Sequence, residues 1–212
     1  YVRLHQDPEY ERLQPAIEEV LHALERGELR EEVNRILLAQ MATMHALNAR
    51  YDLLVWESDI VRAGLLQKAL ALLEQSPHVF RPREGKYAGA LVMDASPVIP
   101  GLEDPFFVLL RSNGTATYYA KDIAFQFWKM GILEGLRFRP YENPYYPGLR
   151  TSAPEGEAYT PKAEETINVI DVRQSHPQAR VRAALALAGY PALAEKAHHL
   201  ADETGHLEGR QM

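Results

Sequence analysis

The chain of 212 residues contains no cysteine, which excludes disulfide bonds, thiol catalysis and cysteine-bound zinc or iron–sulfur sites. It also lacks a long apolar run, so no segment is predicted to cross a membrane. An excess of positive charge is absent as well. The formal net charge of -6 argues against a uniformly basic nucleic-acid binder, although a local basic groove remains compatible with it. The first residues do not resemble a signal peptide, and together these absences predict a cytoplasmic protein.

What is present is the composition of a globular protein, with 46% hydrophobic and 25% charged residues. In the first third, apolar residues between positions 28 and 50 recur every three or four residues, which predicts an amphipathic helix. Another helix is predicted over residues 60–73. We therefore expect a mainly helical segment over residues 1–75.

The middle of the chain changes to short apolar runs bounded by Gly, Pro and Asp. Residues 89–94 and 106–111 are predicted strands, and a helix is predicted over 117–130. A buried strand is predicted over 166–171 and a helix over 177–188. This alternation of strands and helices predicts an α/β fold with a parallel sheet.

Two further segments complete the expected organisation. The stretch 141–163 is rich in Pro and Gly, which predicts a long loop or insertion. A last strand is predicted over about 198–207.

The most informative segment runs from Arg111 to Ala124. Its Asn113-Gly114 pair predicts a tight turn, and the helix that follows places Tyr118 and Asp122 four residues apart on one face. A phenol and a carboxylate at a strand-to-helix junction suit a cationic ligand such as a guanidinium. The alternative is an ordinary helix start with a solvent-facing Asp and a packed Tyr, and spacing alone favours that alternative.

The same segment resembles the signature of class I arginyl-tRNA synthetases, [DN]-G-x-x-T-Y-x-x-x-D-I-A. Other segments of the chain look like pieces of that family in the same order: 50–58, 89–94, 167–174 and 199–212. Because these segments are spread along the sequence, the resemblance extends over nearly the whole chain. The last of these is similar to the approach to the family's KMSKS loop and stops at Met212. The chain thus looks like an internal catalytic-core fragment of a bacterial enzyme of the thermophilic type.

The resemblance implies a fold and a function. Residues 76–212 would be part of a Rossmann-type catalytic core that carries the insertion at 141–163. The parent activity would be the ATP-dependent attachment of L-arginine to tRNA(Arg), assisted by Mg²⁺. No cofactor is expected to bind tightly to this fragment.

The resemblance also implies roles for particular residues. Tyr118, Asp122 and Gln174 would bind the substrate arginine. His176 would contact the nucleotide, or alternatively would be an ordinary residue at a helix start. The family's usual Gly-Ala-Asp before the Gln is replaced by Asp-Val-Arg at 171–173, which puts the ATP-ribose side of the site in doubt.

One signature of the class is missing from the sequence. A His-x-Gly-His motif, which holds ATP phosphates at a helix N-terminus, is not found, and the KMSKS-type loop is incomplete. We therefore expect this chain alone to form no arginyl-adenylate.

Departures near the C-terminus suggest a second interpretation. Polar or small residues stand where the family favours apolar ones: Arg180, Asp202, Gly205 and His206. They raise the alternative of an engineered or truncated, non-catalytic scaffold whose altered surface binds a protein or ligand. A metal site at His198, Asp202 and His206 is a further alternative, but exposed histidines near an end are favoured over it.

Overall fold

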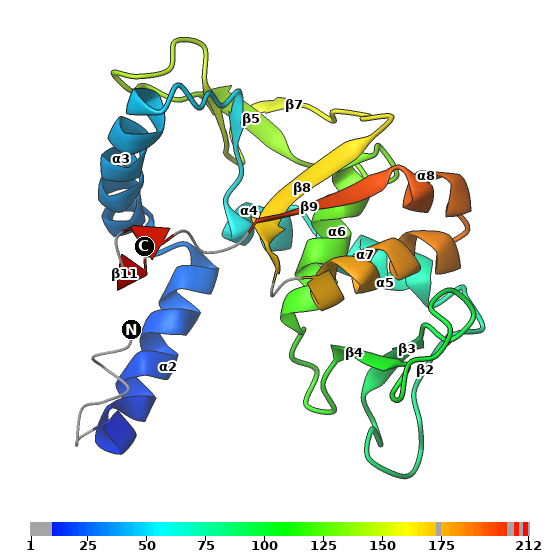
Figure 1. Ribbon diagram of the computed structural model, residues 1–212. Coiled ribbons are helices and arrows are strands. Elements are labelled where there is room, and N and C mark those ends of the chain that lie inside the picture. The colour runs from blue at the N-terminus through cyan, green and yellow to red at the C-terminus, as the bar shows by residue number, and fades with distance from the viewer. Residues whose placement is uncertain (1–9, 173–174, 203–205, 208–209, 212) are drawn as a thin grey trace. The chain divides into compact units, whose positions relative to one another are not determined.

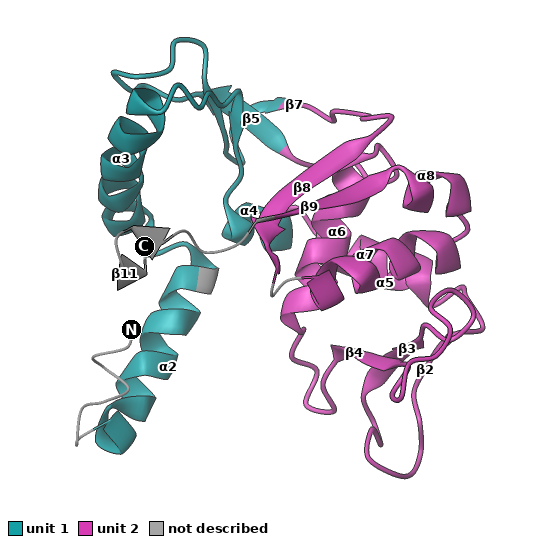
Figure 2. Cartoon of the chain, in the orientation of Figure 1, with its two compact units in different colours: residues 1–62, 137–157 teal, residues 63–136, 158–212 magenta. Residues whose placement is uncertain are grey.

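The computed structural model describes residues 10–172, 175–202, 206–207 and 210–211 (Figure 1). The chain forms two compact units (Figure 2). Unit 1 contains residues 1–62 and 137–157, and unit 2 contains residues 63–136 and 158–212. Helices combine with sheets that include parallel strands, so the predicted α/β class is confirmed. The expected domain division after residue 75 stays a prediction.

Unit 1 begins with two helices, in the segment predicted to be mainly helical. Helix α2 (Tyr10–Arg26) contains Pro15 without being interrupted by it, and Gly27, with a φ of 74°, follows its last residue. Helix α3 (Arg30–Ala46) corresponds to the helix predicted between 28 and 50.

The helix predicted over residues 60–73 is in fact two helices. They are α4 (Glu57–Arg62) and α5 (Leu65–Leu73). Gly64 separates them because its φ of 68° lies in the left-handed region, which a continuous right-handed helix does not contain.

The sheet of unit 1 draws on the segment that we expected to be a loop. Its strand order is β1-β6-β5-β7, with β1 parallel to β6 and β5 antiparallel to β6. The strands are β1 (Leu53–Leu54), β5 (Arg137–Pro140), β6 (Arg150–Ser152) and β7 (Glu157–Ala158). Of the two alternatives for 141–163, a loop was wrong where β6 and β7 form, and an insertion stays a prediction. Tyr146 and Leu149 from this segment are buried against Met41 of α3, which explains how a Pro-rich stretch becomes ordered.

In unit 2, helix α5 is followed by an antiparallel sheet. Strands β2 (Val79–Phe80), β3 (Leu91–Asp94) and β4 (Phe106–Leu110) pair in that order. The sequence predicted a parallel sheet without naming strand pairs, and this sheet is antiparallel. The segment that joins β3 to β4 contains no helix, and a crossover long enough for parallel pairing usually needs one.

Parallel pairing does occur between the last two long strands of unit 2. Strand β8 (Thr166–Asp171) pairs with β9 (Ala197–Asp202) in parallel, and helices α7 (Ser175–Leu187) and α8 (Pro191–Glu195) form the crossover. A short antiparallel pair, β10 (His206–Leu207) with β11 (Arg210–Gln211), follows. Among the described residues, no helix has the length and apolar character needed to cross a bilayer.

Candidate functional site

The Asn-Gly turn between β4 and helix α6 (Tyr118–Lys129) has the predicted form. Gly114 has a φ of 84°, and its N–H donates to the Arg111 carbonyl at 2.8 Å. The Thr115 N–H donates to Asn113 Oδ1 at 3.0 Å, so the Asn side chain closes the turn locally. The turn therefore connects the end of β4 to the start of α6.

Thr117, the residue before α6, ties the helix start to strand β4. Its hydroxyl donates to the Val108 carbonyl at 2.8 Å, and its N–H donates to the Leu109 carbonyl at 2.9 Å. The side chain makes no capping bond to the helix, although threonine is a common capping residue. Thr117 therefore serves to fix α6 to the sheet.

Helix α6 divides sharply into two faces. The buried face is formed by side chains that are at most 1% exposed: Ala120, Ile123, Ala124 and Phe127. The other face contains a stripe at helical spacing: Tyr118, Asp122, Phe125 and Lys129. Tyr118 and Asp122 thus share one face of a helix whose opposite side is anchored in the core.

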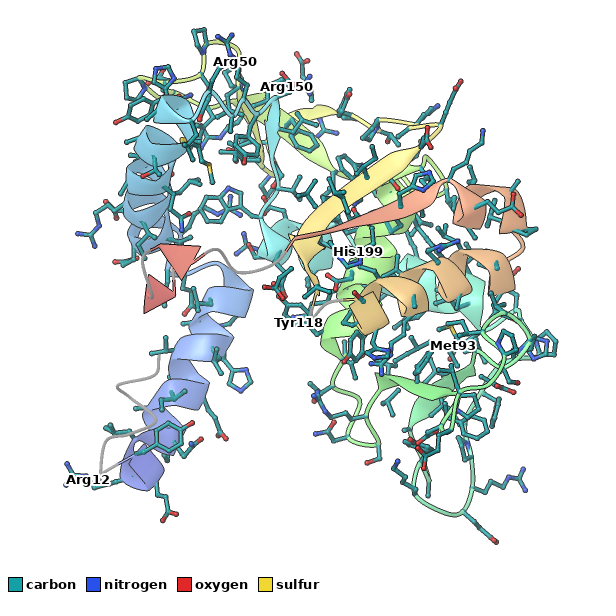
Figure 3. All side chains as sticks on the ribbon, in the orientation of Figure 1. Arg12, Arg50, Met93, Tyr118, Arg150 and His199 are labelled. Carbon is teal, nitrogen blue, oxygen red and sulfur yellow. The ribbon has the colours of Figure 1, made fainter. Side chains whose placement is uncertain are left out.

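A cavity of about 370 Å³ lies in unit 2 between α6, β8 and α7. Its lining from α6 includes Asp122, Phe125 and Lys129, while β8 and α7 contribute Asn168 and Gln178 among others. Tyr118 does not line the cavity and is 68% exposed. It lies at the start of α6 (Figure 3). The cavity therefore brings one of the three predicted arginine contacts, Asp122, together with polar groups from two other elements.

These polar groups form a connected network. Lys129 Nζ donates to Asn168 Oδ1 at 2.6 Å, and Asn168 Nδ2 donates to Gln178 Oε1 at 2.8 Å. Behind them, the buried Gln126 Nε2 donates to Thr166 Oγ1 at 2.7 Å. A lysine ammonium can only donate, so Lys129 fixes which end of the Asn168 amide faces it. Gln178 in turn accepts through its oxygen and has its N–H groups for other partners.

Two opposite charges border the cavity. Burial lowers the pKa of Lys129 to about 8, and the Asp122 carboxylate opposes that shift only partly. Asp122 supplies a negative group suited to a cationic ligand, and Lys129 supplies a positive charge that weakens as the pH approaches 8. At pH 7 the Asp122 carboxylate attracts a cationic ligand, and the protonated Lys129 opposes it.

Sequence reasoning did not identify Lys129, Asn168, Gln126 or Gln178. A signal was available for Asn168, because it interrupts the apolar run of β8 on the same strand face as Thr166. Lys129 is seven residues after Asp122 and so lies on its helical face. No comparable signal marks Gln178, whose place in the network depends on how α7 packs.

The remaining predicted site residues are distributed as follows. Gln174 lies outside the described residues. His176 is exposed in the first turn of α7. Both roles, arginine contact and nucleotide contact, stay predictions.

The histidines of β9 have protein partners. His198 Nε2 lies 2.5 Å from Glu165 Oε1, and His199 Nε2 lies 2.9 Å from the Ile170 carbonyl oxygen. In the described ranges, no group of three His, Cys, Asp or Glu residues is disposed to hold a metal ion. The side chains of Asp202 and His206 and all of Gly205 lie outside those ranges, so the His198–Asp202–His206 alternative is not tested.

Comparison with known proteins was made by sequence and by structure. No family model matches the chain. It is 98% identical over all 212 residues to an arginine–tRNA ligase of Thermus thermophilus, of which it spans 36%. It is 49% identical over 215 positions to the ligase of Deinococcus radiodurans, where the match covers 99% of the chain and 35% of the relative. The solved Thermus thermophilus arginyl-tRNA synthetase superimposes with a TM-score of 0.92 at 98% identity, covering the whole chain and 36% of that structure.

The α/β architecture and the T-Y-x-x-x-D helix therefore belong to part of an aminoacyl-tRNA synthetase. Within that class, the chain belongs to the arginyl-tRNA synthetase family and corresponds to about a third of the length of its relatives. The family resemblance inferred from the sequence is confirmed.

The alternative of an engineered scaffold finds no support. At 98% identity over its full length, the chain has almost entirely the sequence of the Thermus enzyme. Arg180 is half-buried between two aromatic rings, those of Phe107 and Tyr119.

Proposed function

We propose that this chain supplies the arginine-reading part of an arginine–tRNA ligase, and that the cavity between α6, β8 and α7 receives the arginine side chain. The observation that carries the proposal is the position of Asp122. It stands at the Asp of the T-Y-x-x-x-D-I-A segment and lines a cavity whose other polar groups are held in a network.

The chemistry of the cavity suits a guanidinium. A carboxylate can accept two parallel N–H bonds from a guanidinium, which is planar and charged at all working pH values. Lysine would offer a compact point charge instead, and citrulline would offer the same shape without the charge. Asp122 would therefore select arginine over both.

Tyr118 and Gln174 complete the proposed arginine contacts. Tyr118 stands one helical turn before Asp122 on the same face and is exposed, so its hydroxyl is accessible to a ligand that reaches beyond the cavity. Gln174 comes shortly before α7, the helix that contributes Gln178 to the lining. His176, in the first turn of α7, is proposed as a contact to the nucleotide.

The complete reaction would be the ligation of arginine to tRNA(Arg) with ATP and Mg²⁺, in the cytoplasm. The sequence has no His-x-Gly-His motif to hold the triphosphate. We therefore derive no step through ATP from this chain. Its own residues would bind and orient arginine. Other parts of the ligase would bind ATP and carry out the reaction at its phosphates.

The test is to remove the charge of Asp122 without changing its shape. Asp122→Asn is expected to weaken arginine binding about 10- to 100-fold, because a hydrogen bond to a charged group contributes roughly 1.5–3 kcal/mol. Isothermal titration calorimetry of the purified chain measures the change.

The matched control is Glu103→Gln, which also removes one negative charge. Glu103 is an exposed residue of unit 2 and does not line the cavity. It should leave arginine affinity unchanged. Equal weakening by both variants would mean that net charge, and not the cavity, attracts arginine.

A further inference from the structure

Arg180 of α7 lies between two aromatic rings that belong to two other elements of unit 2. Its guanidinium carbon is 4.3 Å from the ring centroid of Phe107 in β4 and 4.3 Å from that of Tyr119 in α6. The Arg180 Nε is buried and has no hydrogen-bond partner within the described part of the chain. A buried, unmatched N–H on a charged group is unfavourable, so the contacts with the two rings must account for its position.

The stack is placed beside the proposed arginine site without being part of it. Tyr119 directly follows Tyr118 and precedes Asp122 by one turn of α6. On α7, the residues Gln178 and Val181 flank Arg180 in sequence and line the cavity. Arg180 therefore connects the start of one helix that lines the cavity to another helix that lines it, while Phe107 anchors both to the sheet.

We propose that Arg180 is a positioning residue, which holds the first turn of α6 against α7 and so sets the arrangement of Tyr118 and Asp122 for arginine. The inference rests on the proposed function and adds a residue that touches no substrate. A planar guanidinium has two faces and can contact a ring on each, which the ammonium group of lysine cannot do in the same way. This accounts for a charged residue in the otherwise apolar stripe that includes Val181, Ala184 and Leu185.

Two variants separate the contributions of charge and of planarity. Arg180→Met keeps an unbranched side chain and removes the charge, whereas Arg180→Lys keeps the charge and removes the planar group. The matched control is Lys86→Met, which removes an exposed cation–π contact with Tyr87 (4.8 Å) in the same unit, away from the cavity.

The first measurement needs no ligand. Hydrogen exchange, followed residue by residue by NMR, reports on the amides of residues 121–123, which in an α-helix bond to the carbonyls of residues 117–119. Arg180→Met is expected to speed their exchange at least tenfold relative to the amides of α5. The exchange rate in Arg180→Lys should lie between those of Arg180→Met and wild type. An unchanged rate, or an equal acceleration in α5 and α6, would overturn the positioning role.

The second measurement is calorimetric titration of the same folded variants with L-arginine. The dissociation constant is expected to rise about tenfold in Arg180→Met, less in Arg180→Lys and not at all in Lys86→Met. Faster exchange at 121–123 with unchanged arginine affinity would overturn the link to the ligand. If the wild-type chain itself did not bind arginine, the proposed function would fail, and the exchange data would still decide whether Arg180 holds the start of α6.

Discussion

At the scale of single residues, the candidate site is defined by charges that the helix period places together. Asp122 and Lys129 are seven residues apart, and both line the same cavity. Burial lowers the pKa of Lys129 from 10.5 to about 8, so its charge is partly lost at mildly alkaline pH. Arginine keeps its guanidinium charge throughout that range.

This pair predicts that arginine binding depends on pH. Affinity should increase several-fold from pH 7 to pH 8.5, because a protonated Lys129 repels a cationic ligand and a neutral one does not. Lys129→Met should bind arginine more tightly than wild type at pH 7 and should lose this dependence. Titration calorimetry at the two pH values measures both effects.

The control for that experiment is Lys86→Met, because Lys86 is exposed and its pKa is raised by Asp104. Its pH dependence should match that of wild type. If Lys129→Met kept the wild-type dependence, the titrating group would have to lie elsewhere.

The same Lys129 shift has a consequence for stability. The folded-state pKa lies below the unfolded value, so the unfolded chain binds more protons between about pH 8 and 10.5. The contribution of Lys129 therefore favours the folded state increasingly as the pH rises through that window.

At the scale of elements, the unit that positions the site is strand β4, the Asn-Gly turn and helix α6. Most of this unit could be predicted, because Asn113-Gly114 has strong turn chemistry and α6 has a clear apolar face. The direction in which β3 pairs with β4 was not predicted, because the apolar runs of the two strands do not encode it. The break at Gly64 was missed because apolar residues continue on both sides of it.

Thr117 provides a test of how this unit is held together. Thr117→Val keeps the side-chain shape and removes the buried hydroxyl that donates to the carbonyl of Val108, so that carbonyl loses this hydrogen bond. The free energy of unfolding should fall by about 1 kcal/mol. Urea denaturation monitored by circular dichroism measures it.

Thr115→Val is the matched control, because Thr115 is exposed in the turn and only its backbone groups take part in the hydrogen bonds there. It should change stability by less than about half as much. Equal effects of the two substitutions would show that β-branched packing, and not the hydroxyl, matters at this junction.

At the scale of the whole chain, the ordered motifs identified the family, and the fold class followed from the alternation of strands and helices. The polar network of the cavity could not be predicted in the same way. The bond between Lys129 and Asn168 joins residues 39 positions apart, and it exists only because α6 packs on β8. Spacing rules describe one element at a time. They placed Tyr118 and Asp122 on one helix face, and the family resemblance gave Asp122 its proposed role, but neither pointed to the neighbours from β8 and α7.

The chain spans 36% of its Thermus relative, and this leads to a prediction about activity. The chain alone should catalyse no arginine-dependent exchange of pyrophosphate into ATP, with or without tRNA, because it lacks the His-x-Gly-His motif and a complete KMSKS-type loop. Radiolabelled pyrophosphate exchange tests this directly. Exchange above the level of a sample without arginine would show that other residues of this chain handle the triphosphate.

The central claim is that the cavity between α6, β8 and α7 recognises arginine, and its most direct test is ligand selectivity. The purified chain should be titrated with L-arginine, L-lysine and L-citrulline under identical conditions. We expect binding of arginine and at least tenfold weaker binding of the other two, because only arginine presents a planar cation to Asp122. A folded chain that binds none of them, or that binds citrulline as well as arginine, would contradict the claim.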